Sequence, residues 1–192
     1  MSKIVLMGDS ITEYMPYIYK GKIGNPEDEV QYKGVSNIGV GNYMKYGLSR
    51  RISECADVYI LLIGINNILR PDCDYDNKET LVDLESKLKE FISEIVKNTS
   101  ARLIVQSIYP TKYQEHIGDI IFINKQIQSY CENIGIEYLN MYDLLKDEND
   151  LLDPKYSDDG IHPNNKGYCI VAEAINKQLV LELPKRLNFE KK

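Results

Sequence analysis

Residues 3–10 read KIVLMGDS, and this stretch sets the architecture that we expect for the whole chain. Its first five residues form a short apolar run rich in strand formers, and the run ends at Gly8. An apolar strand of this kind is typical of a parallel sheet that is covered by helices on both faces. Asp9 and Ser10 follow at the carboxyl end of the strand, which is where open α/β sheets bind ligands.

The same pattern recurs downstream, where apolar runs alternate with segments of helical periodicity. In the segment 80–97, leucine, phenylalanine and isoleucine recur at spacings of three and four, with charged residues between them, which predicts an amphipathic helix. Strands that alternate with such helices predict an α/β fold with a five-stranded parallel sheet. The predicted strands are 3–7, 30–36, 57–63, 102–108 and 136–140, and the predicted helices are 42–54, 80–97, 118–133 and 164–181.

The length of 192 residues suits one domain, which we expect to cover residues 1–183 and to be followed by a charged tail, 184–192. Because 23 basic residues are outnumbered by 29 acidic ones, nucleic acid and anionic membrane surfaces are poor candidates for a partner. No apolar stretch is long enough to span a bilayer, and the start does not resemble a signal peptide. We therefore expect a cytoplasmic protein without stable membrane insertion, and no feature indicates its oligomeric state.

Four cysteines and two histidines are present, which bears on metal binding. Cys55, Cys73, Cys131 and Cys169 are widely spaced and form no Cys-x-x-Cys pair. This spacing predicts reduced thiols and no structural metal site.

Ser10 is the first candidate for chemistry. A serine that follows a glycine at the end of a strand can project into the crevice at the carboxyl edge of the sheet. Its hydroxyl becomes nucleophilic only beside a base. Taken alone, the motif is more typical of a helix N-cap.

The sequence DGIHP at residues 159–163 supplies a base in the same chain. A histidine three residues after an aspartate can lie over it on one turn. Asp159 can then accept the Nδ1 proton of His162 and leave Nε2 to face a serine hydroxyl. A surface Asp–His pair beside a helix start is the alternative reading. The other histidine, His116, stands in a polar stretch that we interpret as a solvated loop.

Two more loops follow predicted strands and carry hydrogen-bond donors. Residues 37–41 read NIGVG, and residues 64–67 read GINN. The absence of a side chain at Gly39 lets a backbone N–H approach an oxyanion, and the Asn66 amide is an uncharged donor. Each loop alone is also compatible with an ordinary turn.

The order Gly-Asp-Ser, Asn-x-Gly, Gly-x-Asn and Asp-x-x-His, from residue 8 to residue 162, resembles the SGNH hydrolase (GDSL-type esterase and lipase) family. The resemblance implies Ser10 as nucleophile, His162 as general base and then acid, and Asp159 as its orienting partner. It implies an oxyanion hole formed by the N–H groups of Ser10 and Gly39 and the Asn66 amide. It also implies a flavodoxin-like three-layer α/β/α fold and a reaction without metal or organic cofactor.

Three positions depart from the family pattern. Ile11 stands where leucine is usual after the serine, and Asn67 stands where many members have aspartate. Gly41 follows Gly39 after two residues, where a spacing of three is common.

The substrate that we expect is a small-molecule ester, most simply an O-acetyl group on a carbohydrate or another small alcohol, because no lid or large insertion would cover a long acyl chain. A short-chain lysophospholipase or thioesterase of the same family is an alternative. Tyr14, Tyr17 and Tyr19 could line a pocket mouth, although they equally fit a general preference for tyrosine, of which the chain has 15.

Two readings from other classes compete with the esterase. Gly39 and Gly41 form the only Gly-x-Gly, but they lack the third glycine of a dinucleotide-binding loop and follow the second strand. A non-catalytic relative that binds carbohydrate or a partner protein is the other reading. It is disfavoured because every expected catalytic position carries a competent side chain.

Overall fold

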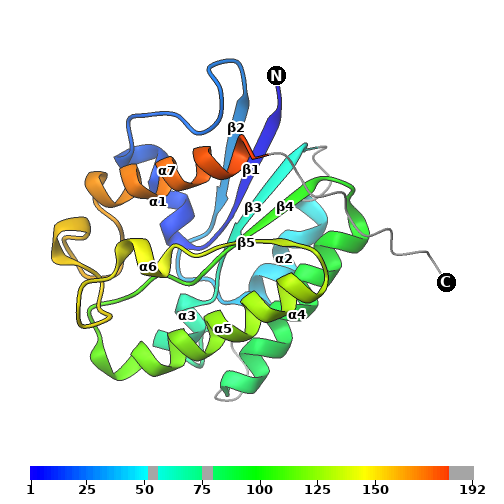
Figure 1. The fold of residues 1–192 in the computed structure, drawn as a ribbon. Coiled ribbons are helices and arrows are strands. Elements are labelled where there is room, and N and C mark those ends of the chain that lie inside the picture. Colours follow the sequence, from blue (N-terminus) through cyan, green and yellow to red (C-terminus); the bar gives the residue numbers. More distant parts are fainter. Residues whose placement is uncertain (52–55, 75–79, 182–192) are drawn as a thin grey trace.

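The computed structural model describes residues 1–51, 56–74 and 80–181 and confirms the predicted α/β architecture (Figure 1). Five strands form one parallel sheet in the order β2-β1-β3-β4-β5. The end of the predicted helix 42–54 and the predicted tail 184–192 lie outside the described residues. The strands are β1 (Lys3–Gly8), β2 (Glu29–Gly34), β3 (Val58–Leu62), β4 (Arg102–Gln106) and β5 (Glu137–Leu139).

Helices cover both faces of the sheet (Figure 1). The helices α1 and α7 contact each other on one face, whereas α2, α4 and α5 pack together on the other. The longer helices are α1 (Ser10–Ile18), α2 (Val40–Arg51), α4 (Leu81–Asn98), α5 (Ile117–Asn133) and α7 (Asn165–Leu179). The short ones are α3 (Ile65–Leu69), α6 (Tyr142–Leu145) and the 3₁₀ turns η1 (Gln114–His116) and η2 (Pro154–Tyr156).

Helix α1 is the main element that the sequence pattern did not predict. Asp9 is its N-cap and accepts a hydrogen bond of 3.0 Å from the Ile11 N–H. Pro16 lies inside the helix, which ends two residues later. A proline inside a segment of only nine residues hides its helical character, because proline normally argues against a helix interior.

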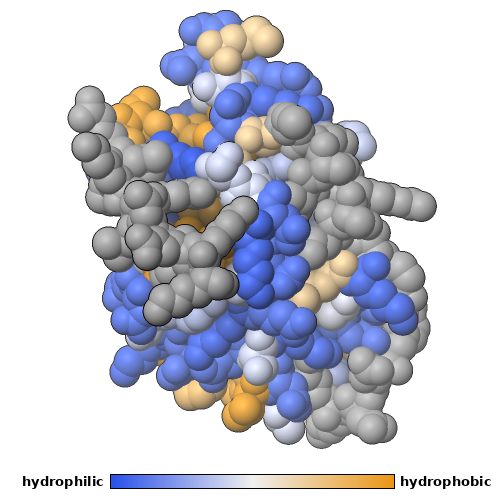
Figure 2. Space-filling model, turned by 90° about the vertical axis from the view of Figure 1, so that its right-hand side faces the viewer, coloured by the Kyte–Doolittle hydropathy of each residue, from blue (hydrophilic) through white to orange (hydrophobic). Residues whose placement is uncertain are grey.

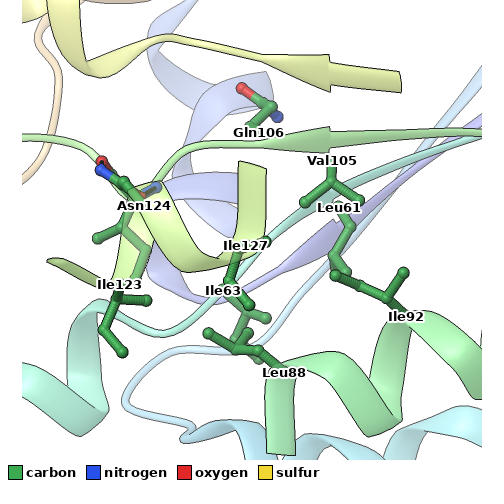
Figure 3. Close-up of a pocket in the computed structure, with 10 residues that line it drawn as sticks. Leu61, Ile63, Leu88, Ile92, Val105, Gln106, Ile123, Asn124 and Ile127 are labelled. Carbon is green, nitrogen blue, oxygen red and sulfur yellow. Dashed lines mark hydrogen bonds between the residues drawn. The ribbon is translucent and has the colours of Figure 1, made fainter. Parts of the chain in front are cut away.

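The core between the sheet and helices α4 and α5 is tightly filled. Leu84, Leu88, Phe91, Ile92 and Ile95 form the buried face of α4, in line with the predicted periodicity. Figure 3 shows side chains of the sheet facing those of the two helices around a small cavity of about 10 Å³. A space of this size is about that of one water molecule. The cavity is therefore a packing gap in the core and cannot admit a substrate.

The strand register aligns three strand ends. Gly8 pairs with Gly34 of β2 on one side and with Leu62 of β3 on the other. The connections after the neighbouring strands β1 and β3 lead to opposite faces of the sheet, which makes this place the switch point of the topology. The strands approach so closely that a Cβ atom at Gly8 would lie 1.9 Å from the Leu62 carbonyl oxygen.

Where the face shown in Figure 2 is coloured, hydrophilic residues predominate, and apolar residues form a few patches among them. Across the described ranges, no helix combines the length and the apolar character that crossing a membrane requires. Cys131 and Cys169 are free thiols.

Replacing Gly8 with alanine should destabilise the protein, because the new Cβ would meet backbone atoms that cannot move aside. We expect a loss of about 1–3 kcal/mol or more in the free energy of unfolding, measured by urea denaturation. Gly118→Ala is the matched control. A Cβ at this position of α5 meets nothing within 4 Å, so it should gain about 0.5–1 kcal/mol. Equal stability of the two variants would contradict the close approach of β1 and β3.

Candidate active site

Ser10 lies at the switch point of the sheet, two residues beyond the end of β1. It is the first residue of α1 and is only 8% exposed. Its position at the helix start leaves its backbone N–H without an acceptor inside the helix. The side chain and the N–H of Ser10 therefore both belong to the crevice at the carboxyl edge of the sheet.

A hydrogen-bonded chain joins Ser10 to His162 and Asp159. The Ser10 Oγ lies 2.8 Å from the His162 Nε2, and the His162 Nδ1 lies 2.6 Å from the Asp159 Oδ2. Because an ionised carboxylate can only accept, Nδ1 carries the proton in this arrangement. Nε2 is then left as the acceptor for the Ser10 hydroxyl.

The backbone of the loop 157–163 holds this pair in place. The Asp159 Oδ1 accepts the N–H groups of Ile161 and His162, each at 2.8 Å. The buried Ser157 hydroxyl donates to the His162 carbonyl at 2.7 Å. Gly160 adopts a φ of 81°, a value that favours glycine. The carboxylate is thus anchored by one oxygen and presents the other to the imidazole.

The loop reaches Ser10 because α7 packs on α1. Tyr168 of α7 is fully buried, and its hydroxyl donates to the Ile11 carbonyl at 2.7 Å. Asn164 caps the start of α7 by accepting the N–H groups of Lys166 and Gly167. A buried hydrogen bond of this kind fixes the position of one helix on the other, which brings the residues just before α7 over the start of α1.

Two aspartates beside the imidazole have opposite pKa shifts. Partial burial alone would raise the pKa of Asp159, but hydrogen bonds from the His162 ring and from the N–H groups of His162 and Ile161 lower it to about 2. Asp9 is completely buried, and this desolvation raises its pKa to about 7 although the Ile11 N–H bond opposes the rise. Its Oδ2 atom has no hydrogen-bond partner in the described parts of the chain.

Asn66 lies in α3, directly after β3. Gly64 precedes it with a φ of 124°, a backbone conformation that side chains disfavour, and this turn starts α3. The Asn66 Nδ2 donates to the Ile38 carbonyl at 3.0 Å, and the Asn66 Oδ1 accepts from the Arg70 Nη2 at 3.3 Å. These two contacts set the orientation of the amide. They leave the second Nδ2 hydrogen available.

Gly39 lies at the start of α2, where a pair of side chains secures the backbone. Asn67 accepts the Val40 N–H at 3.0 Å. The buried Asp74 accepts the Gly41 and Asn42 N–H groups at 2.9 and 2.8 Å and the Asn67 amide at 2.8 Å. A Cβ at Gly39 would meet the Asp74 carboxylate at 2.4 Å. Asp74 thus anchors the loop that contains Gly39. No local sequence pattern indicated this role for Asp74.

A cavity of about 340 Å³ opens beside Ser10 and His162. Residues from five separate segments line it. One wall comes from the segment around α3, including Asn66, Leu69 and Arg70, and another comes from the segment 113–116. His116, which we interpreted as part of a solvated loop, lies in this second wall with Tyr113, because η1 brings the segment over the crevice.

The three tyrosines that follow Ser10 lie in different surroundings. The Tyr14 ring lies 5.1 Å from the His162 ring, centroid to centroid, and is tilted by 46°. Tyr17 is 73% exposed, and Tyr19 packs against the core. Only Tyr14 is therefore in a position to influence the imidazole.

Comparison of the sequence with known proteins identifies a matching family. Residues 6–170 match the model of the GDSL-like Lipase/Acylhydrolase family. A curated relative, the N-acylneuraminate cytidylyltransferase of Escherichia coli O18:K1:H7 (strain RS218 / NMEC), is 26% identical over 178 residues. The match covers 91% of this chain but only 40% of the length of that relative.

Solved structures share the fold. A GDSL-like lipase from Bacteroides thetaiotaomicron VPI-5482 has a TM-score of 0.76 at 19% identity and covers 93% of this chain and 87% of its own. An acetylxylan esterase from Geobacillus stearothermophilus has a TM-score of 0.73 at 19% identity, with 96% and 97% covered.

The buried Asp9 should make stability depend on pH. Its pKa lies near 7 in the folded state and near 3.8 in a model compound, so the folded state binds more protons between these values. The contribution to stability is full below about pH 4 and is lost as the pH rises through 7, by at most about 1.4 kcal/mol per pH unit.

Asp9→Asn removes this titration while retaining the size of the side chain. The stability of the wild type relative to the variant should therefore fall as the pH rises from 5 to 8, measured by urea unfolding at each pH. A constant difference between the two proteins would show that Asp9 does not titrate in this range.

Proposed function

The chain belongs to the GDSL-like lipase/acylhydrolase family, and on this basis we propose that it is a carboxylic ester hydrolase in which Ser10, His162 and Asp159 act as the catalytic triad. The observation that carries the proposal is the hydrogen-bonded chain from the Ser10 hydroxyl through both ring nitrogens of His162 to Asp159, at 2.8 and 2.6 Å. A base that is oriented by a third group is the arrangement that activates a serine.

In the proposed first half-reaction, the Ser10 Oγ attacks the ester carbonyl carbon while the His162 Nε2 takes its proton. The Asp159 carboxylate stabilises the imidazolium that forms. His162 then gives the proton to the alcohol oxygen as the carbon–oxygen bond of the ester breaks. The alcohol leaves, and the acyl group remains on Ser10.

In the second half-reaction, water replaces the alcohol. His162 takes a proton from the water as its oxygen attacks the acyl carbon, and returns a proton to the Ser10 Oγ as that bond breaks. The acid leaves and the enzyme is restored, which is hydrolysis by two related displacements.

The oxyanion of each tetrahedral intermediate needs donors that are already in place. We assign this role to the N–H groups of Ser10 and Gly39 and to the Asn66 Nδ2. Support comes from the contacts around them. Ile38 and Arg70 hold the Asn66 amide, and neither of the two N–H groups has an acceptor within the described residues. Preorganised donors of this kind often provide the largest single contribution to catalysis.

The proposed substrate is the ester of a small acyl group, with O-acetyl on a carbohydrate as the first choice. The cavity wall mixes Asn37, Arg70, Glu115 and His116 with a few apolar side chains, which suits a hydroxylated alcohol better than a long hydrocarbon. The relatives' names point the same way, since one is an acetylxylan esterase and another acts on an N-acylneuraminate. A cytoplasmic location stays a prediction from the sequence.

Two other functions remain as outcomes of the tests. A short-chain lysophospholipase or thioesterase would use the same triad and would differ in the alcohol or thiol that it releases. A non-catalytic carbohydrate- or partner-binding relative would show no turnover.

Ser10→Ala should reduce hydrolysis of p-nitrophenyl acetate to background, because it removes the hydroxyl that the proposed mechanism uses as nucleophile. Asp159→Asn should lower kcat by roughly 100- to 10,000-fold, because the wrong tautomer of His162 is then favoured. Asp158→Asn is the matched control, since it removes the adjacent exposed carboxylate, which among the described residues accepts a hydrogen bond from Asn164 and does not bond to His162. Unchanged activity of Ser10→Ala would refute the proposed nucleophile.

The chain-length preference separates the proposed substrate from the lipid alternatives. We expect kcat/KM to fall from p-nitrophenyl acetate to butyrate to octanoate, because polar and charged side chains interrupt the apolar surface of the cavity wall. A maximum at octanoate would favour a lipid substrate. Absence of turnover for all three esters, with Ser10→Ala equally inactive, would favour the non-catalytic relative.

Asp74→Ala should lower kcat by roughly 10- to 100-fold although the residue touches no substrate, because the backbone at Gly39 loses its anchor. This loss is smaller than the roughly 100- to 1,000-fold cost of removing a donor outright. Thr80→Ala is the control, since it removes the N-cap of α4 at a cost of about 1 kcal/mol. The control should retain kcat. Equal kcat values for both variants and the wild type would contradict the role of Asp74.

A further inference from the structure

Arg70 has no role in the proposed triad or among the proposed oxyanion donors, yet it lines the same cavity as Ser10 and His162. It follows α3 directly, and its side chain is exposed. Its Nη2 atom donates to the Asn37 carbonyl at 3.2 Å and to the Asn66 Oδ1 at 3.3 Å. Both are long for hydrogen bonds, and the Nε and Nη1 donors make none within the described residues.

The charge of Arg70 is also not paired with an acidic group among the described residues. Arg102, the other arginine whose side chain is described, forms a two-pronged ion pair with Glu137 at 2.7 and 2.6 Å. Arg70 forms no ion pair anywhere in the described ranges. Glu115 lines the same cavity from η1 and forms no ion pair with Arg70. An unpaired guanidinium is therefore presented to the cavity of a chain whose net charge is −6.

A guanidinium is suited to one kind of ligand. Its planar fork of donors matches a carboxylate in two parallel hydrogen bonds. The two contacts of Nη2 hold one edge of the group against the oxyanion side of the site, and the remaining donors are left for a ligand. Because an acetyl group occupies little of a cavity of about 340 Å³, most of the space belongs to the alcohol part of the ester.

We propose that Arg70 binds a carboxylate on the alcohol part of the substrate, so that the enzyme acts on O-acylated acidic carbohydrates in preference to neutral ones. This inference rests on the proposed function and adds the charge of the substrate. Arg70 is a specificity residue through this contact, and it also positions Asn66. A test must separate the two effects.

The test compares two esters of the same shape, 3-carboxyphenyl acetate and 3-carbamoylphenyl acetate, in the wild type and in Arg70→Gln at pH 7. Any loss of Asn66 orientation lowers kcat/KM for both esters and cancels in their ratio. Loss of the contact between Arg70 and the carboxylate lowers kcat/KM for 3-carboxyphenyl acetate relative to that for 3-carbamoylphenyl acetate. We expect Arg70→Gln to reduce the preference for the carboxylate by roughly 10- to 100-fold, and added salt to reduce it in the wild type.

Lys112→Gln is the matched control. This exposed lysine packs along Gly160 beside the site but is not part of the cavity wall. The substitution Lys112→Gln also removes one positive charge near the site. The ratio of kcat/KM for the two esters should therefore change less than about threefold in this variant. An unchanged ratio in Arg70→Gln, or an equal change in both variants, would overturn the proposal while leaving the esterase intact.

Binding measured without turnover keeps the two proposals distinguishable. In Ser10→Ala, 3-hydroxybenzoate should raise the melting temperature more than 3-hydroxybenzamide, and this difference should vanish in the double variant with Arg70→Gln. Equal shifts by the two compounds would refute the carboxylate contact. Loss of esterase activity alone would not, because this readout does not depend on the triad.

Discussion

The central place of β1 in the sheet is the constraint on which the site depends. Because Gly8 pairs with Gly34 on one side and Leu62 on the other, three strands stop at one level. The chain then leaves in different directions, and the first residues of three loops face the same crevice. Ser10 and Asn66 lie within four residues of this line in the chain, and Gly39 lies five residues beyond it. A shift of one strand by one residue in register would turn each of its side chains to the other face of the sheet. Such a shift would separate the proposed oxyanion donors from the nucleophile.

The remaining part of the site arrives from the far end of the chain, and α7 delivers it. Ser10 and His162 are 152 residues apart and still hydrogen-bonded. The contact depends on the packing of α7 against α1, which the buried Tyr168 hydroxyl fixes through the Ile11 carbonyl. The geometry of the Asp159–His162 pair is local, whereas its position over Ser10 is a property of helix packing.

Three aspartates near the site show how environment decides what one side chain does. Asp159 is partly exposed and accepts both backbone and imidazole donors, so it stays ionised and orients the ring. Asp9 is buried, and one of its oxygens has no hydrogen-bond partner in the described part of the chain, so its pKa is raised and it serves mainly as the cap of α1. Asp74 is buried but surrounded by N–H donors, which lets it anchor the loop of Gly39. The number of hydrogen-bond donors around each carboxylate, more than its burial, accounts for the different roles of the three aspartates.

The sequence by itself determined the α/β class, the five strands and the buried face of α4, because apolar periodicity reports burial directly. It also brought Asp159 and His162 together, since a spacing of three places them on one turn. It did not indicate α1, where Pro16 hides the helical pattern. Only the tertiary structure placed Asp74 against Gly41, His116 in the cavity wall and Arg70 beside Asn66. Spacing along the chain sets local hydrogen bonds, whereas contacts between distant segments depend on how helices pack on the sheet and leave no periodic mark in the sequence.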